Sequence, residues 1–169
     1  MSFWKAFFSK EKRYTDGEID VYLLDVYPSQ PKDNIDQTFY FRITLHGKRQ
    51  EIGYVSVRDG EGGLMYYAGH IGYHITEKER GKHYALRACR LIAPALCELG
   101  FLDAVITCNP DNEASIHTIE NLKTLREARV PVPEKYRKAL DGSTEKLRYI
   151  WDIKAEAQSR KENADAADA

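Results

Sequence analysis

The sequence predicts an α+β fold, α/β-like in its second half, with a mixed sheet of six or seven strands flanked by helices. Three observations support this prediction. Short β-rich segments separated by turn residues fill the chain up to residue 75, as in an antiparallel sheet. From residue 84 the apolar residues recur at helical spacing. Strand, helix and strand patterns then follow in an order that packs helices against a sheet.

Four strands are predicted in the first half. The second and third of them alternate apolar or aromatic residues with polar ones, and a turn at residues 46–48 makes them a hairpin. Gly69 and Gly72 interrupt the fourth, which indicates a bulge or a close backbone approach. The four strands cover residues 19–27, 38–45, 51–58 and 64–75.

The second half begins with an amphipathic helix from residue 84, which Gly100 closes. Pro94 inside it removes one backbone hydrogen bond at a cost of roughly 3 kcal/mol, so we expect a kink there. The further predicted elements are a strand over residues 102–108, a turn at residues 109–112 that can cap a helix, a short helical stripe at Ile116, Ile119 and Leu122, an edge strand or loop at residues 130–133, and a strand over residues 147–153.

We expect one domain, residues 1–154, followed by a charged tail, residues 155–169, that is weakly helical or disordered. A chain of 169 residues buries about 70% of its unfolded surface and needs no disulfide or metal for stability. The three cysteines form no Cys-x-x-Cys pair, so we expect no metal site and interpret Cys89, Cys97 and Cys108 as buried free thiols in a reducing compartment.

The overall charge and hydropathy exclude some partners. Lys and Arg number 25 against 26 Asp and Glu, which lacks the basic excess of a nucleic-acid-binding protein. No stretch approaches the ~20 apolar residues of a membrane span, and the N-terminus lacks a signal-peptide pattern. We therefore expect a cytoplasmic protein with no nucleic-acid or membrane partner. Phe3, Trp4, Phe7 and Phe8 have helical spacing and are expected to cover the core or the partner in a homodimer.

The most informative local feature is the loop at residues 80–85, which precedes the first predicted helix. A helix N-terminus presents unpaired N–H groups and the positive end of the helix dipole. Small residues let a phosphate approach this backbone, and Arg80 and Lys82 add charge, so the loop predicts a pyrophosphate site. The alternative is an ordinary helix start with solvated basic side chains.

This arrangement resembles the GNAT superfamily of N-acetyltransferases, most clearly over residues 64–122. The family's pyrophosphate loop reads Arg/Gln-x-x-Gly-x-Gly/Ala. Arg80 and Ala85 match its first and last positions, while His83 stands where glycine is usual. Residues 69–75 look like the family's splayed fourth strand, and residues 105–115 look like its fifth strand with the turn that contains Asn112.

The resemblance implies a V-shaped opening between these two strands, with acetyl-CoA as cosubstrate. The pantetheine arm of acetyl-CoA would pair with the backbone like an added strand. Its pyrophosphate would lie on the loop, and the residues that match the family's binding positions are His74, Ile75 and Thr76 for the arm, Arg80, Gly81, Lys82, His83, Tyr84 and Ala85 for the pyrophosphate, and Asn112 and Ser115 for either one.

In this family an amine attacks the thioester directly, helped by a base, an oxyanion donor and an acid. The usual acid is a tyrosine that aligns with Ile119, so it is missing here. His70 is our leading candidate for the base, because it lies about where relatives place a glutamate and its ordinary pKa suits that role. The alternative is a histidine satisfied by the backbone. Weaker candidates are Tyr73, Tyr66, Glu51 and His117.

The predicted function is an N-acetyltransferase that moves an acetyl group from acetyl-CoA directly to a primary amine of an unknown acceptor. Only about ten residues, 28–37, separate the first two predicted strands, where many relatives carry two helices. This predicts an open acceptor side that suits a small molecule, a protein or a peptide. The alternative, suggested by the missing tyrosine and by His83, is an acyl-CoA-binding regulatory or sensor module with little activity. A nucleotide-phosphate binder is the third possibility.

Overall fold

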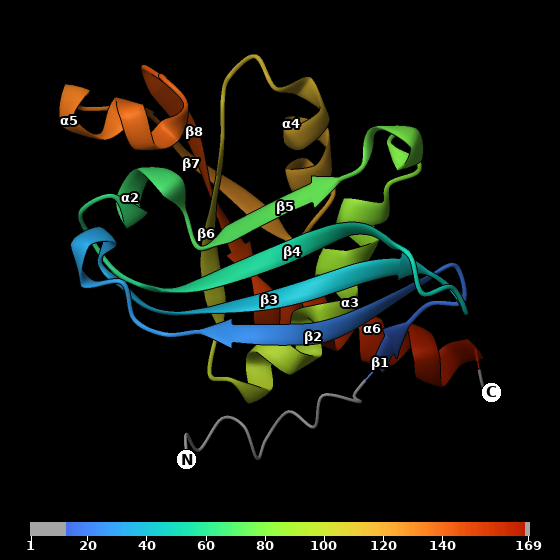
Figure 1. The fold of residues 1–169 in the computed structure, drawn as a ribbon. Helices are drawn as coiled ribbons and strands as arrows, with labels where there is room; N and C mark the ends of the chain where they lie inside the picture. The colour runs from blue at the N-terminus through green and yellow to red at the C-terminus, as the bar shows by residue number, and fades with distance from the viewer. Residues whose placement is uncertain (1–12, 168–169) are drawn as a thin grey trace.

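A computed structural model describes residues 13–167, which form one mixed sheet flanked by helices (Figure 1). The sheet has the strand order β1-β2-β3-β4-β5-β6-β8-β7, and only β5 and β6 are parallel neighbours. The predicted role of Phe3, Trp4, Phe7 and Phe8 lies outside the described residues. The strands are β1 (Arg13–Thr15), β2 (Ile19–Tyr27), β3 (Ile35–Leu45), β4 (Glu51–Gly60), β5 (Ile71–Ile75), β6 (Asp103–Cys108), β7 (Thr124–Pro131) and β8 (Glu145–Asp152).

The predicted α+β fold is confirmed, with eight strands in place of six or seven. Strand β1 has three residues, too few to show an alternating pattern. Strand β7 begins at Thr124, well before the predicted edge segment, and it is the outermost strand beside β8. An edge strand has one unpaired side, so it tolerates Pro131, which has no N–H to donate.

The core lies between the sheet and helix α3 (Tyr84–Glu98), which packs against β2, β4 and β5. Phe39, Phe41 and Ile43 of β3 are fully or almost fully buried, and the residues between them point to the opposite face of the sheet. The predicted amphipathic helix is confirmed. Gly100 follows it with a φ of +92°, a conformation that glycine adopts at little cost.

The C-terminal segment forms helix α6 (Ile153–Ala167), which packs along α3. Glu156 of α6 is buried and pairs with Arg90 of α3, with 3.2 Å between Oε1 and Nε. Its other carboxylate oxygen accepts the backbone N–H of Lys123 at 2.8 Å and the indole N–H of Trp151 at 3.4 Å. Helix α6 is therefore tied to the core through one buried carboxylate. None of the described helices is long and apolar enough to cross a membrane.

Residues 64–75 do not form one strand, contrary to the prediction. Helix α2 (Met65–Ala68) occupies the first part, and Gly69 then turns the chain with a φ of +72°. A Cβ at Gly69 would lie 2.9 Å from the carbonyl oxygen of Val105, so this glycine permits the close approach to β6. The remaining helices are α4 (Glu113–Glu120), α5 (Glu134–Arg137) and the short 3-10 segments η1 (Pro31–Asp33), η2 (Glu77–Glu79) and η3 (Lys138–Leu140).

Candidate active site

Strands β5 and β6 diverge soon after they meet. Only one residue pair, Ile71 with Ile106, joins them in register, and the N–H of His70 donates to the Val105 carbonyl at 2.7 Å just before it. Beyond this point β5 pairs with β4 and β6 pairs with β8. The sheet therefore opens at the carboxyl ends of β5 and β6, toward α4 and the loop that precedes α3 (Figure 1).

The loop at residues 80–85 leads into α3 through two residues in the left-handed region. Gly81 has a φ of +79°, and His83, the N-cap residue of α3, has a φ of +59°. No side chain caps this helix, so its first N–H groups remain available to an anion. The backbone at His83 also gives a physical reason for the family's usual glycine, since a residue with a Cβ costs roughly 1–2 kcal/mol in this conformation.

A cavity of about 450 Å³ lies in the opening, between the end of β5, the loop and the first turns of α4. Asn112 caps α4 by accepting the N–H of Ser115 at 3.0 Å, as its position in the predicted turn indicated. The cavity brings together most of the residues that the resemblance singled out: Tyr73, His74, Ile75, Arg80, Gly81, His83, Tyr84, Ala85, Asn112 and Ser115.

Two of the expected contacts lie elsewhere, and several lining residues were not anticipated. The Lys82 ammonium pairs with the Glu79 carboxylate at 2.8 Å and does not line this cavity. Thr76 lines a separate hollow beside the hairpin of β3 and β4. Sequence reasoning missed Thr118, which lies one helical turn after Ser115, so the spacing of three residues could have revealed it. The other lining residues are Glu79, Ala114 and His117.

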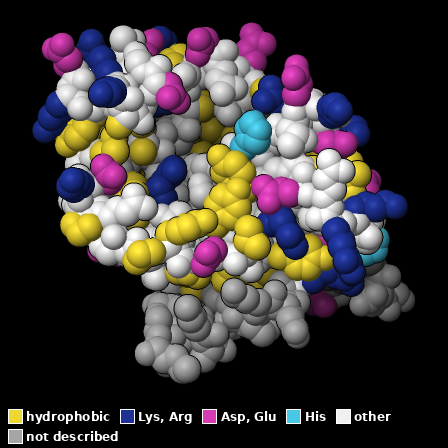
Figure 2. All heavy atoms as spheres, in the orientation of Figure 1, with side chains coloured by type: hydrophobic (Ala, Val, Ile, Leu, Met, Phe, Trp, Pro, Cys, Tyr) yellow, Lys and Arg dark blue, Asp and Glu magenta, His cyan; other side chains and the backbone are white. Residues whose placement is uncertain are grey.

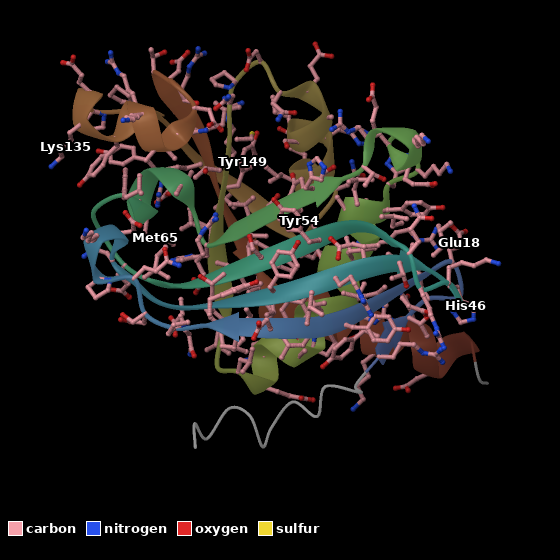
Figure 3. The ribbon with its side chains drawn as sticks, in the orientation of Figure 1. Glu18, His46, Tyr54, Met65, Lys135 and Tyr149 are labelled. Carbon is pink, nitrogen blue, oxygen red and sulfur yellow. The ribbon has the colours of Figure 1, made fainter. Side chains whose placement is uncertain are left out.

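A second cavity of about 420 Å³ lies on the other side of Tyr73. Its walls come from α2, β4, β5, η3 and the ends of β6 and β8. Tyr73 and Ser115 line both cavities, so the two spaces lie on either side of these residues and share them as a wall. Figure 2 shows that the surface is hollowed beside α2. Figure 3 shows Met65 of α2 at one end of the sheet, far from His46 at the opposite end.

The phenol of Tyr73 lies in the wall that the two cavities share. Its hydroxyl donates to the backbone carbonyl of Ser115 at 3.4 Å. Burial raises the pKa of Tyr73 above its ordinary value, and the hydrogen bond with Ser115 only partly offsets this effect. The phenol is therefore protonated at neutral pH, so it can donate a hydrogen bond and does not suit a base.

His70 lies in the turn before β5, and both of its ring nitrogens have backbone partners. Nδ1 accepts the N–H of Val105 at 2.9 Å, so the ring proton resides on Nε2, which donates to the carbonyl of Gly60 at 3.1 Å. Burial lowers the pKa of His70, although the Gly60 carbonyl opposes this shift. This geometry favours the alternative of a backbone-satisfied histidine, because no ring nitrogen is free to accept a proton.

The weaker base candidates differ in their surroundings. Tyr66 lies under the guanidinium of Arg148, which is 3.8 Å from the ring centroid. Glu51 accepts from the hydroxyl of Tyr40 at 3.5 Å and lines neither of the two cavities. His117 does line the first cavity, with its ring 5.5 Å from that of His83.

The geometry agrees with an independent comparison of the sequence with protein families. The model of the acetyltransferase (GNAT) domain matches residues 2–124. The chain belongs to this acetyltransferase family. Ile119, which aligns with the acidic tyrosine of many GNAT proteins, is fully buried in the core. This GNAT chain therefore has no proton donor at that position. A search of curated proteins gives no match.

Solved structures share the GNAT fold of this chain at low sequence identity. The ribosomal-protein-S5-alanine acetyltransferase from Vibrio fischeri has a TM-score of 0.62 and 15% identity, over 84% of this chain and 97% of that one. The ribosomal L7/L12 alpha-N-protein acetyltransferase RimL in complex with coenzyme A has a TM-score of 0.54 and 19% identity, over 70% of this chain and 63% of that one. The microcin C7 self-immunity acetyltransferase MccE, in complex with acetyl-CoA and AMP, has a TM-score of 0.52 and 22% identity, over 67% of this chain and 59% of that one.

Proposed function

We propose that this protein transfers an acetyl group from acetyl-CoA directly to a primary amine. The observation that carries the proposal is that two cavities share Tyr73 and Ser115 as lining residues. Direct transfer requires a donor and an acceptor to reach one point from different sides, because the amine must attack the thioester within about 3–3.5 Å. One cavity has the features of a CoA site, and the other leaves room for an acceptor.

The first cavity is suited to the CoA half of the reaction. The uncapped N-terminus of α3 and the backbone of the 80–85 loop offer N–H groups to a pyrophosphate. The exposed end of β5, at His74 and Ile75, offers its backbone to the pantetheine arm. Two structurally similar acetyltransferases were solved with coenzyme A or acetyl-CoA bound, which supports the same cosubstrate here.

The chemistry needs few protein groups at this shared wall. The amine nitrogen bonds to the thioester carbonyl carbon, the C–S bond breaks, and the amine proton passes to water. The departing CoA thiolate takes a proton from water, and we assign to Tyr73, whose phenol is kept protonated by burial, a hydrogen bond to the sulfur as the C–S bond breaks. This places a hydrogen-bond donor on β5 and explains how the chain could work with isoleucine at position 119.

Calorimetry with acetyl-CoA tests the pyrophosphate site through Arg80→Glu. Arg80 is exposed at the loop, where its Nε donates to the Ile75 carbonyl at 3.1 Å. The reversed charge should repel the pyrophosphate and weaken binding at least about tenfold, which equals about 1.4 kcal/mol. Arg126→Glu, at an exposed position on β7, is the matched control and should bind as the wild type does. Equal affinity of the Arg80 variant and the wild type would contradict the assignment.

A sensor module that binds acyl-CoA without efficient transfer is the second candidate. The buried Ile119 and the engaged ring nitrogens of His70 favour it, because two groups that commonly assist catalysis are not available. Tight acetyl-CoA binding combined with no acetylated product across a broad amine panel would select this candidate over the enzyme.

A further inference from the structure

The second cavity contains an arginine that is held in place without a counter-charge. Arg58 extends from β4 across β5, where its Nε donates to the Gly69 carbonyl at 3.1 Å and its Nη2 donates to the Ala68 carbonyl at 3.4 Å. Its terminal nitrogens lie over Gly72, where a Cβ would be 3.5 Å from both of them. Two backbone carbonyls therefore fix the guanidinium and leave Nη1 for a further acceptor.

Arg58 has no carboxylate partner in the described part of the chain, although part of its side chain is buried. Within residues 13–167 no Asp or Glu forms an ion pair with it, whereas Arg87 and Arg148 each have one. Burial lowers the pKa of Arg58, and an electrostatic interaction with Tyr54 opposes this shift. A desolvated cation without a counter-charge is unfavourable, and an anion that enters the cavity would offset this cost.

A second cation lines the same cavity from the opposite strand. Lys146 of β8 has its ammonium 2.5 Å from the amide oxygen of Asn109. Burial lowers the pKa of Lys146, and electrostatic interactions with Cys108 and Asp141 oppose the shift. Asp33 and Asp141 also line the cavity, so it offers cationic groups to an anion and two carboxylates that can attract an ammonium group.

We propose that the acceptor is a small amine that also carries a carboxylate or a phosphate. The anionic group lies against Arg58 and Lys146, and the amine points to the shared wall at Tyr73 and Ser115. The cavity of about 420 Å³ suits a small molecule. A planar guanidinium held by its own hydrogen bonds is preorganised for either anion. This inference rests on the proposed acetyl transfer, and it adds the chemical class of the acceptor.

Matched amines test the inference with the wild-type chain. The pairs are 3-aminopropionate with propylamine and 2-aminoethyl phosphate with ethanolamine, and CoA release from acetyl-CoA is the readout. At least one amine with an anionic group should exceed its partner without that group in kcat/KM by about tenfold or more, as expected for about 1.4 kcal/mol of added binding. The better anionic member identifies carboxylate or phosphate as the recognised group. Equal kcat/KM values within both pairs would overturn the inference.

Two variants test whether Arg58 and Lys146 cause the preference for amines that carry an anionic group. Arg58→Gln and Lys146→Gln should each raise KM for the amine that carries the anionic group. The ratio of its kcat/KM to that of its partner should therefore move closer to one. Arg126→Gln is the control and should keep the wild-type ratio. Circular dichroism checks the fold, and Lys146→Gln keeps the test valid if Arg58→Gln does not fold. A ratio that is unchanged in folded variants would contradict the assignment.

Calorimetry separates a failure of this inference from a failure of the proposed function. If acetyl-CoA does not bind, the proposed function fails first. If acetyl-CoA binds but no amine is acetylated, the CoA-loaded protein is titrated with 2-aminoethyl phosphate, ethanolamine, 3-aminopropionate and propylamine. Tighter binding of an anionic amine than of its partner supports the cavity's preference for anions, and equal or absent binding overturns it.

Discussion

Tyr73 is the residue on which the proposed chemistry depends most directly. Tyr73→Phe removes the hydroxyl and keeps the ring, so kcat should fall about 100-fold, the lower end of the range for a lost hydrogen-bond donor to developing charge. The affinity for acetyl-CoA should change little. Tyr27→Phe, at an exposed position on β2, is the control. Steady-state kinetics measures both variants, and a Tyr73→Phe enzyme with wild-type kcat would contradict the role of Tyr73.

The individual site residues show how far sequence reasoning reached. The pattern around Asn112 predicted a helix cap, and the structure has it, because a cap depends on residues three positions apart. The pattern could not give the surroundings of His70, whose two partners, Gly60 and Val105, lie 10 and 35 residues away. The second cavity was missed for the same reason, since Arg58 and Lys146 line one cavity only in the folded chain.

At the scale of elements, helix α6 depends on the buried carboxylate of Glu156. Glu156→Ala leaves the N–H groups of Lys123 and Trp151 and the charge of Arg90 without this partner. We expect a loss of about 2–4 kcal/mol in the free energy of unfolding, measured by urea denaturation. Glu162→Ala, on the exposed side of the same helix, should cost less than about 0.5 kcal/mol. Equal losses would show that the carboxylate does not anchor α6.

The junction between β2 and the β3–β4 hairpin gives a prediction about pH. Asp20 is buried, which opposes its ionisation, but hydrogen bonds from His46 at 2.9 Å and from the Gly47 N–H at 3.0 Å lower its pKa to about 2 (Figure 3 labels His46). Because this pKa is depressed on folding, the carboxylate stabilises the fold above pH ~4, and its contribution of about 2 kcal/mol is lost as the pH falls toward 2.

Asp20→Asn should therefore be less stable than the wild type by about 2 kcal/mol at pH 7, and the difference should shrink toward pH 2. Urea denaturation at several pH values measures this difference. Asp36→Asn, at an exposed position, is the control and should follow the wild type. A difference that stays constant between pH 7 and pH 2 would contradict the depressed pKa.

The elements also show where local patterns are sufficient. The hairpin of β3 and β4 and helix α3 were predicted within a few residues, because their hydrophobic periods are long and regular. Residues 64–75 were wrongly predicted as one strand, since the aromatic residues of α2 favour strands in general. The helix has only four residues, too short to show its period. Tertiary contact at Gly69, close to Val105, determines where β5 begins.

At the scale of the molecule, the site results from one break in an otherwise continuous sheet. Seven strand junctions hold eight strands together, and the junction of β5 with β6 has a single residue pair. Both cavities adjoin this junction and share Tyr73 as a lining residue. The sequence indicated the splayed strands through resemblance to the GNAT family, but the second cavity requires the packing of α2, η3 and β8 around the same opening.

A crystal structure of the chain with acetyl-CoA tests this account most directly. Direct transfer at this site requires that the pyrophosphate lies within hydrogen-bond distance of backbone N–H groups in the 80–85 loop. It also requires that the acetyl carbonyl carbon lies beside Tyr73 and Ser115, open to the second cavity. Acetyl-CoA bound away from the β5–β6 opening, or with its acetyl group closed off from the second cavity, would contradict direct transfer at this site.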